Sequence, residues 1–365
     1  MLKTVTKLNI AVTKEKKTAV TSQTAKDIDK LVNDLNKKFG DNAVTKGVPV
    51  SLSEIERIPT GSISLDIALG GGIPKGRFTE ISGELSSTKT TQALHIIRNA
   101  QEMGLVCALI DVEATTDEDY VKQFGIDYDN LIYANPDSTE EATQIVLDMQ
   151  KSSLVQLVVL DSLAALSPNT EMNKDMDETM RMGITPNLLN EFFRKYQMNN
   201  NRLTRENKPP FTLICLNQRR DKIGAYGDPT YSPGGRGKGF TATVDLVFRR
   251  GDWITEGKGE EREIVGQVVK FKIEKNKTGI RMRSGEFDFY FSENSVGIEP
   301  GYNDIYKDII VCAVEWDVIT RAGSWFQYGD QKYQGQESLV SALRNDQKLL
   351  EKLKEQILLL SKKKG

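Results

Sequence analysis

Histidine and cysteine are scarce in this chain of 365 residues, which contains one His and three Cys. With His95 as the only imidazole, the protein has no site built from several histidine ligands, and nothing around His95 indicates a catalytic triad. We therefore interpret His95 as structural or solvent-facing. Cys107, Cys215 and Cys312 are too few and too widely spaced for a disulfide framework or a zinc site. Because they lie in apolar runs, we expect buried thiols in a reducing compartment.

Long apolar runs and a large excess of one charge are missing as well. No stretch approaches the roughly 20 apolar residues that cross a bilayer, and the polar N-terminus of mixed charge does not indicate a secretory signal. These absences predict a cytoplasmic protein with no membrane partner. The net charge is −2, so nucleic-acid binding would have to come from local basic surface.

The overall composition is typical of a globular protein, with 38% hydrophobic and 27% charged residues. From about Ile58 to Phe291, apolar runs suited to buried strands alternate with helical patterns. This predicts an α/β fold, with a central, mainly parallel sheet and helices on both faces. Two later runs, Ile264–Ile273 and Gly285–Phe291, favour antiparallel strands. The predicted central strands are Val106–Asp111, Leu157–Asp161, Phe211–Asn217 and Val244–Arg249.

Three parts are predicted along the chain: an N-terminal segment over residues 1–50, a core over 51–296 and a small α/β domain over 297–365. The N-terminal segment holds an amphipathic helix that ends at Gly40 and docks either on its own core or on a neighbouring subunit. Its apolar face consists of Ile28, Leu31, Val32, Leu35 and Phe39. The small domain has Trp316, Trp325 and Phe326 as expected core residues, and it ends in the basic tail Lys362–Lys364.

A phosphate-binding loop is indicated between a predicted strand, Phe78–Ile81, and a predicted helix, Thr91–Met103. Its sequence is Gly83-Glu84-Leu85-Ser86-Ser87-Thr88-Lys89-Thr90. They match the pattern G-x-x-x-x-G-K-[ST] except at Thr88, where the pattern has glycine. In such a loop backbone N–H groups surround a triphosphate, Lys89 reaches its β- and γ-phosphates and the Thr90 hydroxyl binds Mg²⁺. The alternative is a Gly/Ser-rich turn that holds a lysine by chance.

Three predicted strands end in polar residues that suit the chemistry of such a loop. Asp161 would help to hold Mg²⁺, and Glu113 would activate the water that attacks the γ-phosphate. Gln218 would touch the γ-phosphate and pass its presence to the loop that follows, as an order–disorder switch. Each residue also has an interpretation without a role in nucleotide chemistry. Asp161 could be an ordinary strand-end acid, Glu113 a solvated loop acid and Gln218 a hydrogen-bonded strand-end amide.

Polar stretches at Asn169–Thr185, Asn199–Pro210 and Arg219–Gly239 are predicted to be loops. The last interleaves basic and aromatic residues on a glycine-rich frame: Arg219, Arg220, Lys222, Tyr226, Tyr231, Arg236 and Lys238. Such a segment suits single-stranded nucleic acid, because cations meet phosphates and apolar or aromatic side chains meet bases. A solvated loop is the alternative.

Taken together and in this order, the motifs resemble those of bacterial-type RecA recombinases over nearly the whole chain. The segments that carry the resemblance are Thr60–Gly70, Gly83–Thr90, Ile110–Glu113, Val159–Leu166, Leu216–Gln218, Lys222–Gly224, Gly234–Gly235 and Lys275–Lys277. The resemblance implies a RecA-like P-loop core and a DNA-dependent ATPase that uses ATP and Mg²⁺. It also implies a homo-oligomer, a helical filament on single-stranded DNA that pairs with homologous duplex DNA in recombination and repair. The divergence from this family suggests a phage-encoded or otherwise distant member in the bacterial cytosol.

The resemblance also assigns roles to residues. Lys89, Glu113 and Gln218 would be catalytic. Lys275 and Lys277 would also be catalytic, and they would reach across the filament interface to the ATP bound by the neighbouring subunit. The nucleotide would be bound by Gly83, Glu84, Leu85, Ser86, Ser87, Thr88, Lys89, Thr90 and Thr91, with Asp117 and Tyr120 at the adenine. The metal would be held by Thr90 and Asp161. DNA would be bound by Met182, Gly183 and Arg194 in or beside a first loop, and by Arg219, Lys222, Ile223, Gly234, Gly235 and Arg236 in a second. Phe240 would lie at the subunit interface.

Three departures from the family pattern affect these expectations. A left-handed backbone at Thr88 would cost about 1–2 kcal/mol, and if that cost fell on ATP binding, affinity would drop roughly five- to thirtyfold. We therefore expect a working but slow ATPase. The alternative is a nucleotide-gated, DNA-binding filament or recombination mediator that hydrolyses little. Asn187 occupies a position at which the best-known members of the family have Arg. The C-terminal tail is basic where well-studied members have an acidic tail, which predicts less restraint on duplex binding.

Overall fold

The computed structural model describes residues 22–47, 55–172, 184–221, 230–279 and 283–364. The chain divides into two compact units, Met1–Ser53 and Glu54–Gly365. In the described part of the first unit, helix α1 (Ser22–Phe39) ends where Gly40 takes a φ of +97°. The predicted amphipathic helix is therefore confirmed. Within this unit the apolar side chains of the helix are not packed into a core, since Leu31 is 58% and Phe39 59% exposed.

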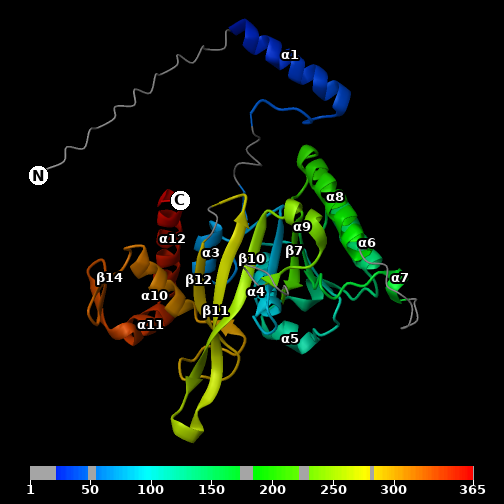
Figure 1. Ribbon diagram of the computed structural model, residues 1–365. Helices are drawn as coiled ribbons and strands as arrows, with labels where there is room; N and C mark the ends of the chain where they lie inside the picture. Colours follow the sequence, from blue (N-terminus) through cyan, green and yellow to red (C-terminus); the bar gives the residue numbers. More distant parts are fainter. Residues whose placement is uncertain (1–21, 48–54, 173–183, 222–229, 280–282, 365) are drawn as a thin grey trace, which may run out of the picture. The chain divides into compact units, whose positions relative to one another are not determined.

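The second unit is built around a nine-stranded sheet with the order β13-β12-β11-β10-β3-β7-β6-β4-β5 (Figure 1). The strands from β10 to β5 pair in parallel, and β10, β11, β12 and β13 pair antiparallel. The predicted mixed architecture is thus confirmed. The bounds are β3 Phe78–Gly83, β4 Cys107–Asp111, β5 Leu131–Ala134, β6 Leu157–Asp161, β7 Thr212–Gln218, β10 Val244–Glu256, β11 Glu263–Asn276, β12 Ser284–Tyr290 and β13 Tyr302–Asn303.

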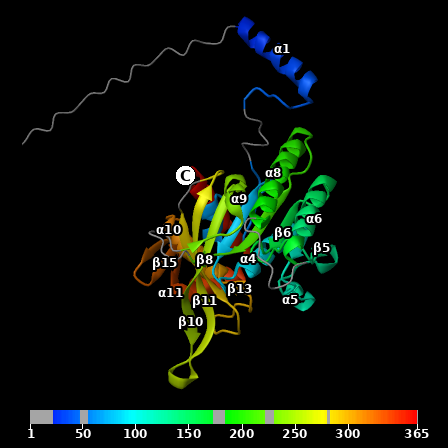
Figure 2. The ribbon, with the colours of Figure 1, turned by 45° about the vertical axis from the view of Figure 1, so that its right-hand side comes forward.

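Helices cover both faces of this sheet because its central strands are apolar on both sides. On β4, Leu109 packs in the core that holds α4 (Lys89–Glu102), whereas Ala108 and Ile110 pack in the core on the other face. That second core includes α6 (Thr139–Ser152) and α8 (Ile184–Arg205), which run together in Figure 2. Ser138 caps α6 by accepting a hydrogen bond from Glu141 N at 3.2 Å.

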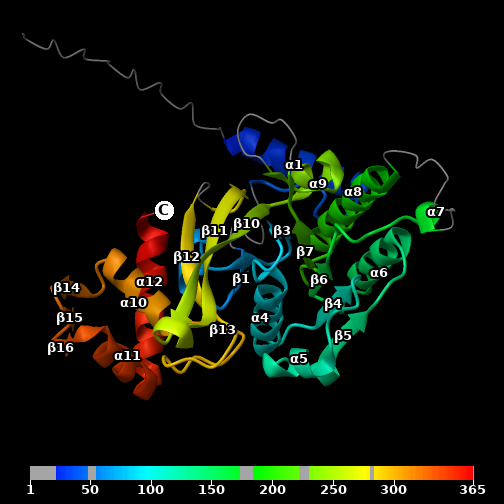
Figure 3. The same cartoon turned by 60° about the horizontal axis from the view of Figure 1, so that its bottom comes forward.

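Shorter elements connect these layers. They are β1 (Arg57–Ile58), β2 (Ile73–Pro74), α3 (Ile63–Leu69), α5 (Glu118–Gln123), α7 (Asn169–Met172), β8 (Arg220–Asp221), β9 (Thr230–Tyr231) and α9 (Gly235–Thr241), with 3₁₀ turns at Tyr128–Asn130 and Gly259–Glu261. The C-terminal part holds α10 (Ile305–Glu315), β14 (Thr320–Ala322), β15 (Trp325–Tyr328), β16 (Gln331–Gln334), α11 (Gly335–Asn345) and α12 (Gln347–Lys364) (Figure 3). Its apolar core extends to Ile63 and Ile67 of α3.

Several sequence-based expectations about the fold are wrong. Two of the stretches predicted to be loops contain helices, α7 in Asn169–Thr185 and the start of α9 in Arg219–Gly239. Residues 199–205 are helical, because Asn200 is buried and exchanges hydrogen bonds with its surroundings: its Nδ2 donates to Gly76 O at 3.0 Å and its Oδ1 accepts from Gln150 at 2.8 Å. Trp325 is 46% exposed and outside the core, whereas Phe326 is buried. Successive side chains on β15 point to opposite faces, so only one of the two can enter the core.

Other expectations are confirmed. All three cysteines are free and buried, and burial raises the pKa of Cys107 to about 12. His95 is structural, because it is 3% exposed and its Nε2 lies 2.9 Å from Gly301 O. Burial lowers its pKa to about 4. Among the described residues, every helix is too short or too polar to cross a bilayer.

Candidate nucleotide and DNA sites

The phosphate-binding loop runs from the end of β3 at Gly83 to the start of α4 at Lys89. Gly83 is required by crowding, since a Cβ there would lie 2.5 Å from Phe248 O and 2.6 Å from Ser87 Oγ. Thr88 caps the helix with φ +62° and ψ 19°, a left-handed conformation. The backbone thus takes at Thr88 the shape that favours glycine, and the β-branched residue carries the expected cost of about 1–2 kcal/mol.

Three predicted site residues, Lys89 and Thr90 of the loop and the strand-end Asp161, lie together at the start of α4. Lys89 Nζ donates to Glu84 O at 2.6 Å and to Ser87 Oγ at 3.3 Å. Burial lowers the pKa of Lys89, against the opposing effect of Asp161 and Glu113. The Thr90 hydroxyl donates to Asp161 Oδ2 at 2.6 Å. The loop cation is therefore folded back onto its own loop, within the field of two carboxylates.

The Thr90 and Asp161 oxygens fit a magnesium ion. Burial raises the pKa of Asp161 to about 6, and the nearby Glu113 and Asp111 add to this effect. A carboxylate in such surroundings is stabilised by a cation. In the part of the chain that the structure describes, no cluster of three or more His, Cys, Asp or Glu side chains could hold a metal. Mg²⁺ is usually held by one or two protein oxygens together with substrate phosphates.

Glu113 and Gln218 follow strands that lie on the same side of β3, the strand that leads into the loop. Glu113 follows β4, which pairs with β6 so that Asp111 is opposite Asp161. Its Oε1 accepts a hydrogen bond from Ser162 Oγ at 2.8 Å. Gln218 ends β7 directly beside Gly83 of β3, and Arg219 N donates to Gly83 O at 3.1 Å. The strand ends thus bring together an acid, an amide and the phosphate loop.

A cavity of about 380 Å³ opens beside the loop. Its lining includes Thr88, Thr91 and Tyr120, and the Tyr120 hydroxyl lies 3.1 Å from Thr91 Oγ1. Asp117 caps α5 by accepting from Tyr120 N at 2.7 Å, which is a structural role that the sequence did not indicate. Two further residues of the lining, Trp253 and Gln267, were missed because they come from distant strands.

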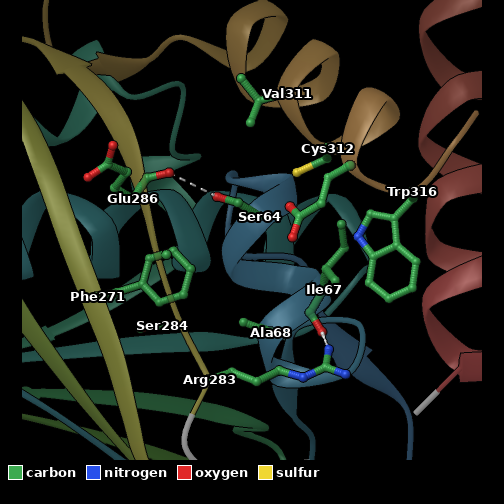
Figure 4. A pocket seen from close by; sticks show the side chains of 12 residues that line it. Ser64, Ile67, Ala68, Phe271, Arg283, Ser284, Glu286, Val311, Cys312 and Trp316 are labelled. Atoms are coloured by element: carbon green, nitrogen blue, oxygen red, sulfur yellow. Dashed lines mark hydrogen bonds between the residues drawn. The ribbon is translucent and has the colours of Figure 1, made fainter. Parts of the chain in front are cut away.

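A second cavity, of about 550 Å³, lies away from this site, between α3, β12 and α10 (Figure 4). Arg283 reaches from its wall to Ile67 O at 3.1 Å, and Ser64 Oγ contacts Glu286 O at 3.5 Å. None of the residues predicted for the site lines it.

Comparison with known proteins identifies the family. The RecA N-terminal domain model matches residues 26–297 and the RecA C-terminal domain model matches residues 307–361. The chain belongs to the RecA family. It is 39% identical over 339 residues to Protein RecA of Aquifex pyrophilus, covering 92% of each chain. It is 37% identical over 326 residues to Protein RecA of Porphyromonas gingivalis, covering 88% of this chain and 90% of that one.

Membership in the RecA family assigns the activity. The protein is a DNA-dependent ATPase of ATP-dependent recombination and strand exchange. The resemblance recognised in the motifs is confirmed. The individual site residues stay predictions.

The segment predicted to be the second DNA loop is anchored by a buried polar cluster. Lys238 and Glu80 form an ion pair at 2.5 Å, with side chains 5% and 1% exposed. Asn217 Nδ2 donates to Glu80 Oε1 at 3.0 Å and to Pro233 O at 2.8 Å. Lys238, which composition grouped with the exposed cations of the loop, is therefore a buried anchor in this structure. The cluster connects β3 and β7 to the end of the loop.

The predicted DNA-binding residues fall in different surroundings. Arg219 has a side chain only 7% exposed, paired with Glu274 at 3.4 Å, so the predicted contact with DNA would require this pair to open. Arg194 is exposed on α8 rather than in a loop. Gly234 caps α9 with φ +113°, and Gly235 and Arg236 begin that helix. Met182, Gly183, Lys222 and Ile223 lie outside the described residues.

The residues predicted for the subunit interface are gathered at one place. Phe240, on α9, is 77% exposed. Lys277 Nζ donates to Phe240 O at 2.8 Å, and Lys275 Nζ donates to the neighbouring Gly239 O. The end of β11 and the residue after it thus place two cations beside the α9 segment that carries the aromatic ring of Phe240.

Proposed function

We propose that the protein assembles as a helical filament on single-stranded DNA, with ATP and Mg²⁺ bound at the loop Gly83–Thr91, and pairs that strand with homologous duplex DNA. The observation that carries the proposal is the register of β3 with β7, which sets Gln218 beside Gly83. Gln218 opens the glycine-rich DNA segment, so one side chain connects the phosphate site to the DNA site.

Binding and hydrolysis follow from the side chains around the loop. Lys89 exchanges its contacts with Glu84 O and Ser87 Oγ for the phosphate oxygens, because a buried ammonium gains more from an anion than from a carbonyl. Thr90 and Asp161 would hold Mg²⁺, which supplies charge neutralisation to the phosphates. Glu113, held by Ser162, accepts the proton of the attacking water.

Nucleotide binding is coupled to DNA binding through Gln218 and the buried cluster. Asn217, the neighbour of Gln218, is bonded to Glu80 and to Pro233 O at the far end of the DNA loop. A shift of the β7 end toward a γ-phosphate therefore moves both ends of the loop together. We propose that this joint movement of its two ends orders the loop when nucleotide is bound, which is an order–disorder switch.

The filament interface would use the patch formed by Phe240, Lys275 and Lys277 together with α1. The two lysines bind backbone carbonyls of α9 within one subunit, and in the filament they would turn to the neighbour's ATP and stabilise the charge of the transition state. The exposed apolar face of α1 would pack on a neighbouring subunit.

Strand exchange is the direct test of this function. Circular single-stranded DNA, linear duplex, ATP and Mg²⁺ are incubated with the protein, and joint molecules are followed on gels. We expect products with homologous duplex and none with a duplex of unrelated sequence. Binding of both DNAs without any homology-dependent product would contradict the proposal.

A hydrolysis-impaired filament is the second candidate, and the left-handed Thr88 favours it. It would bind ATP and DNA and form filaments visible by electron microscopy, with negligible phosphate release. We also propose a location in the bacterial cytosol. A phage origin stays a prediction, which the genes flanking the coding sequence would test.

A further inference from the structure

Trp253 lines the cavity beside the phosphate loop, on the strand pair β10–β11 that projects from the sheet (Figure 1). We propose that Trp253 contacts the substrate and forms, with Tyr120, an aromatic wall on which the nucleobase of ATP stacks. This inference deepens the proposed nucleotide site and rests on it.

The direction of the Trp253 side chain is set by a β-bulge. In the β10–β11 pairing Arg250 is opposite Val269 and Trp253 is opposite Gln267, so two residues of β10 face the single residue Val268. In a regular pairing Asp252 would be opposite Gln267 and Trp253 would point to the other face. The bulge therefore exchanges a carboxylate for an indole on the face that Gln267 occupies.

That face is the one that looks onto the phosphate loop. Gln267 Nε2 donates to Ser86 O at 3.0 Å, so its side chain reaches the loop directly. Residues directly opposite each other on antiparallel strands share a face. Trp253 thus lies on the loop side of β10 and lines the same cavity as Ser86 and Thr88.

Gly251 makes this bulge compact. A Cβ there would lie 3.0 Å from Val268 O and 3.1 Å from Val268 Cβ, so a larger residue would fit only if the neighbouring strand gave way slightly. The three residues of this segment therefore have different roles. Gly251 permits the bulge, Asp252 is moved off the face that Gln267 occupies, and Trp253 becomes part of the cavity wall.

The indole is held in place but is not fully covered. The Arg250 guanidinium lies 4.5 Å from its ring centroid, and Phe291 meets it edge-on with centroids 6.3 Å apart. The indole itself lines the cavity, so part of the ring is accessible to a ligand. The indole remains 44% exposed.

The lining fits a flat aromatic ligand joined to a phosphate chain. Four other ring-bearing side chains surround the cavity, and the phosphate loop closes one side of it; these rings belong to Tyr120, Phe124, Phe289 and Phe291. Stacking on an aromatic ring tolerates any base, because every base has a π-face. Trp253 therefore adds affinity for nucleoside triphosphates in general and does not select adenine.

Calorimetric titration of Mg²⁺–ATP into the full-length chain tests the proposal. We expect Trp253→Ala to weaken ATP binding about tenfold and Trp253→Phe to keep it within about threefold of the native value. Inorganic tripolyphosphate has no base, so its affinity should be the same in all three proteins. Trp325→Ala is the matched control, because Trp325 is 46% exposed on β15 and does not line the cavity.

The outcomes separate this inference from the proposed site. A native chain that binds neither ATP nor tripolyphosphate contradicts the nucleotide site itself. Native binding of ATP with an unchanged affinity in Trp253→Ala overturns the role of Trp253 alone. An equal loss of ATP and tripolyphosphate affinity in Trp253→Ala also overturns it, because the effect would then be on the loop and not on the base.

Discussion

Thr88 is the residue at which the sequence pattern and the backbone conflict. The motif expects glycine, and the structure gives Thr88 a φ of +62°, in the region where a side chain is costly. The Thr88 hydroxyl turns back to Ser87 O at 2.7 Å, and this contact does not change the backbone conformation. A glycine at this position would remove the cost, together with this one hydrogen bond and the part of the cavity wall that the Thr88 side chain forms.

Thr88→Gly should tighten Mg²⁺–ATP binding by about five- to thirtyfold, since it removes about 1–2 kcal/mol of backbone strain. Thr88→Ala is the matched control, because alanine keeps a Cβ at a positive φ and should recover only part of the gain. Equilibrium titration of the three proteins measures the difference. Equal affinities for Thr88→Gly and the native chain would show that the strain does not act on the nucleotide site.

At the scale of elements, the strand ends were predictable and the bulge was not. Asp161, Glu113 and Gln218 follow apolar runs, and parallel strands bring such ends to one edge, so their gathering around the phosphate loop could be foreseen from the sequence. Trp253 could not, because one extra residue in β10 reverses its face and depends on the pairing partner. The helical stretch after Asn199 was missed for a related reason: the buried partners of Asn200 are distant in sequence.

The end of β11 carries a prediction about how subunits share a site. If Lys275 and Lys277 act on the neighbour's ATP, a Glu113→Gln subunit and a Lys275→Ala/Lys277→Ala subunit each lack a different half of one interface site. Each protein alone should be nearly inactive in DNA-stimulated ATP hydrolysis, and an equimolar mixture should regain roughly a quarter of the native rate, because intact interfaces re-form by chance.

A mixture no more active than the two separate proteins would contradict a shared site. Arg202→Ala/Lys208→Ala, two exposed cations that pair with Glu206 away from this interface, is the control and should stay active alone.

At the scale of the whole molecule, α3 connects the sheet to the C-terminal part. Ser62 Oγ donates to Asp308 Oδ2 at 2.8 Å, and Ile63 and Ile67 enter the C-terminal core. Two buried carboxylates lie at this junction. Burial raises the pKa of Asp66 to about 7, despite a hydrogen bond from Thr60 N at 2.8 Å. Burial likewise raises the pKa of Asp308 to about 6.

The raised pKa of Asp66 makes stability depend on pH. The folded chain binds the proton more tightly than the unfolded chain, whose Asp pKa is near 4, so this group stabilises the fold less as pH rises from about 4 to about 7. Asp66→Asn stays neutral, and its melting temperature relative to the native chain should therefore be higher at pH 8 than at pH 5, by about a few °C. Thermal denaturation followed by circular dichroism measures this, and a difference independent of pH would contradict the assignment.

DNA-stimulated ATP turnover tests the central claim most directly. Phosphate release is measured for the native chain and Glu113→Gln at saturating Mg²⁺–ATP, with and without single-stranded DNA. We predict that DNA raises the native rate severalfold or more and that Glu113→Gln lowers the stimulated rate at least about a hundredfold while it still binds DNA. A native rate that does not respond to single-stranded DNA would contradict the account of a phosphate loop coupled through Gln218 to a DNA site.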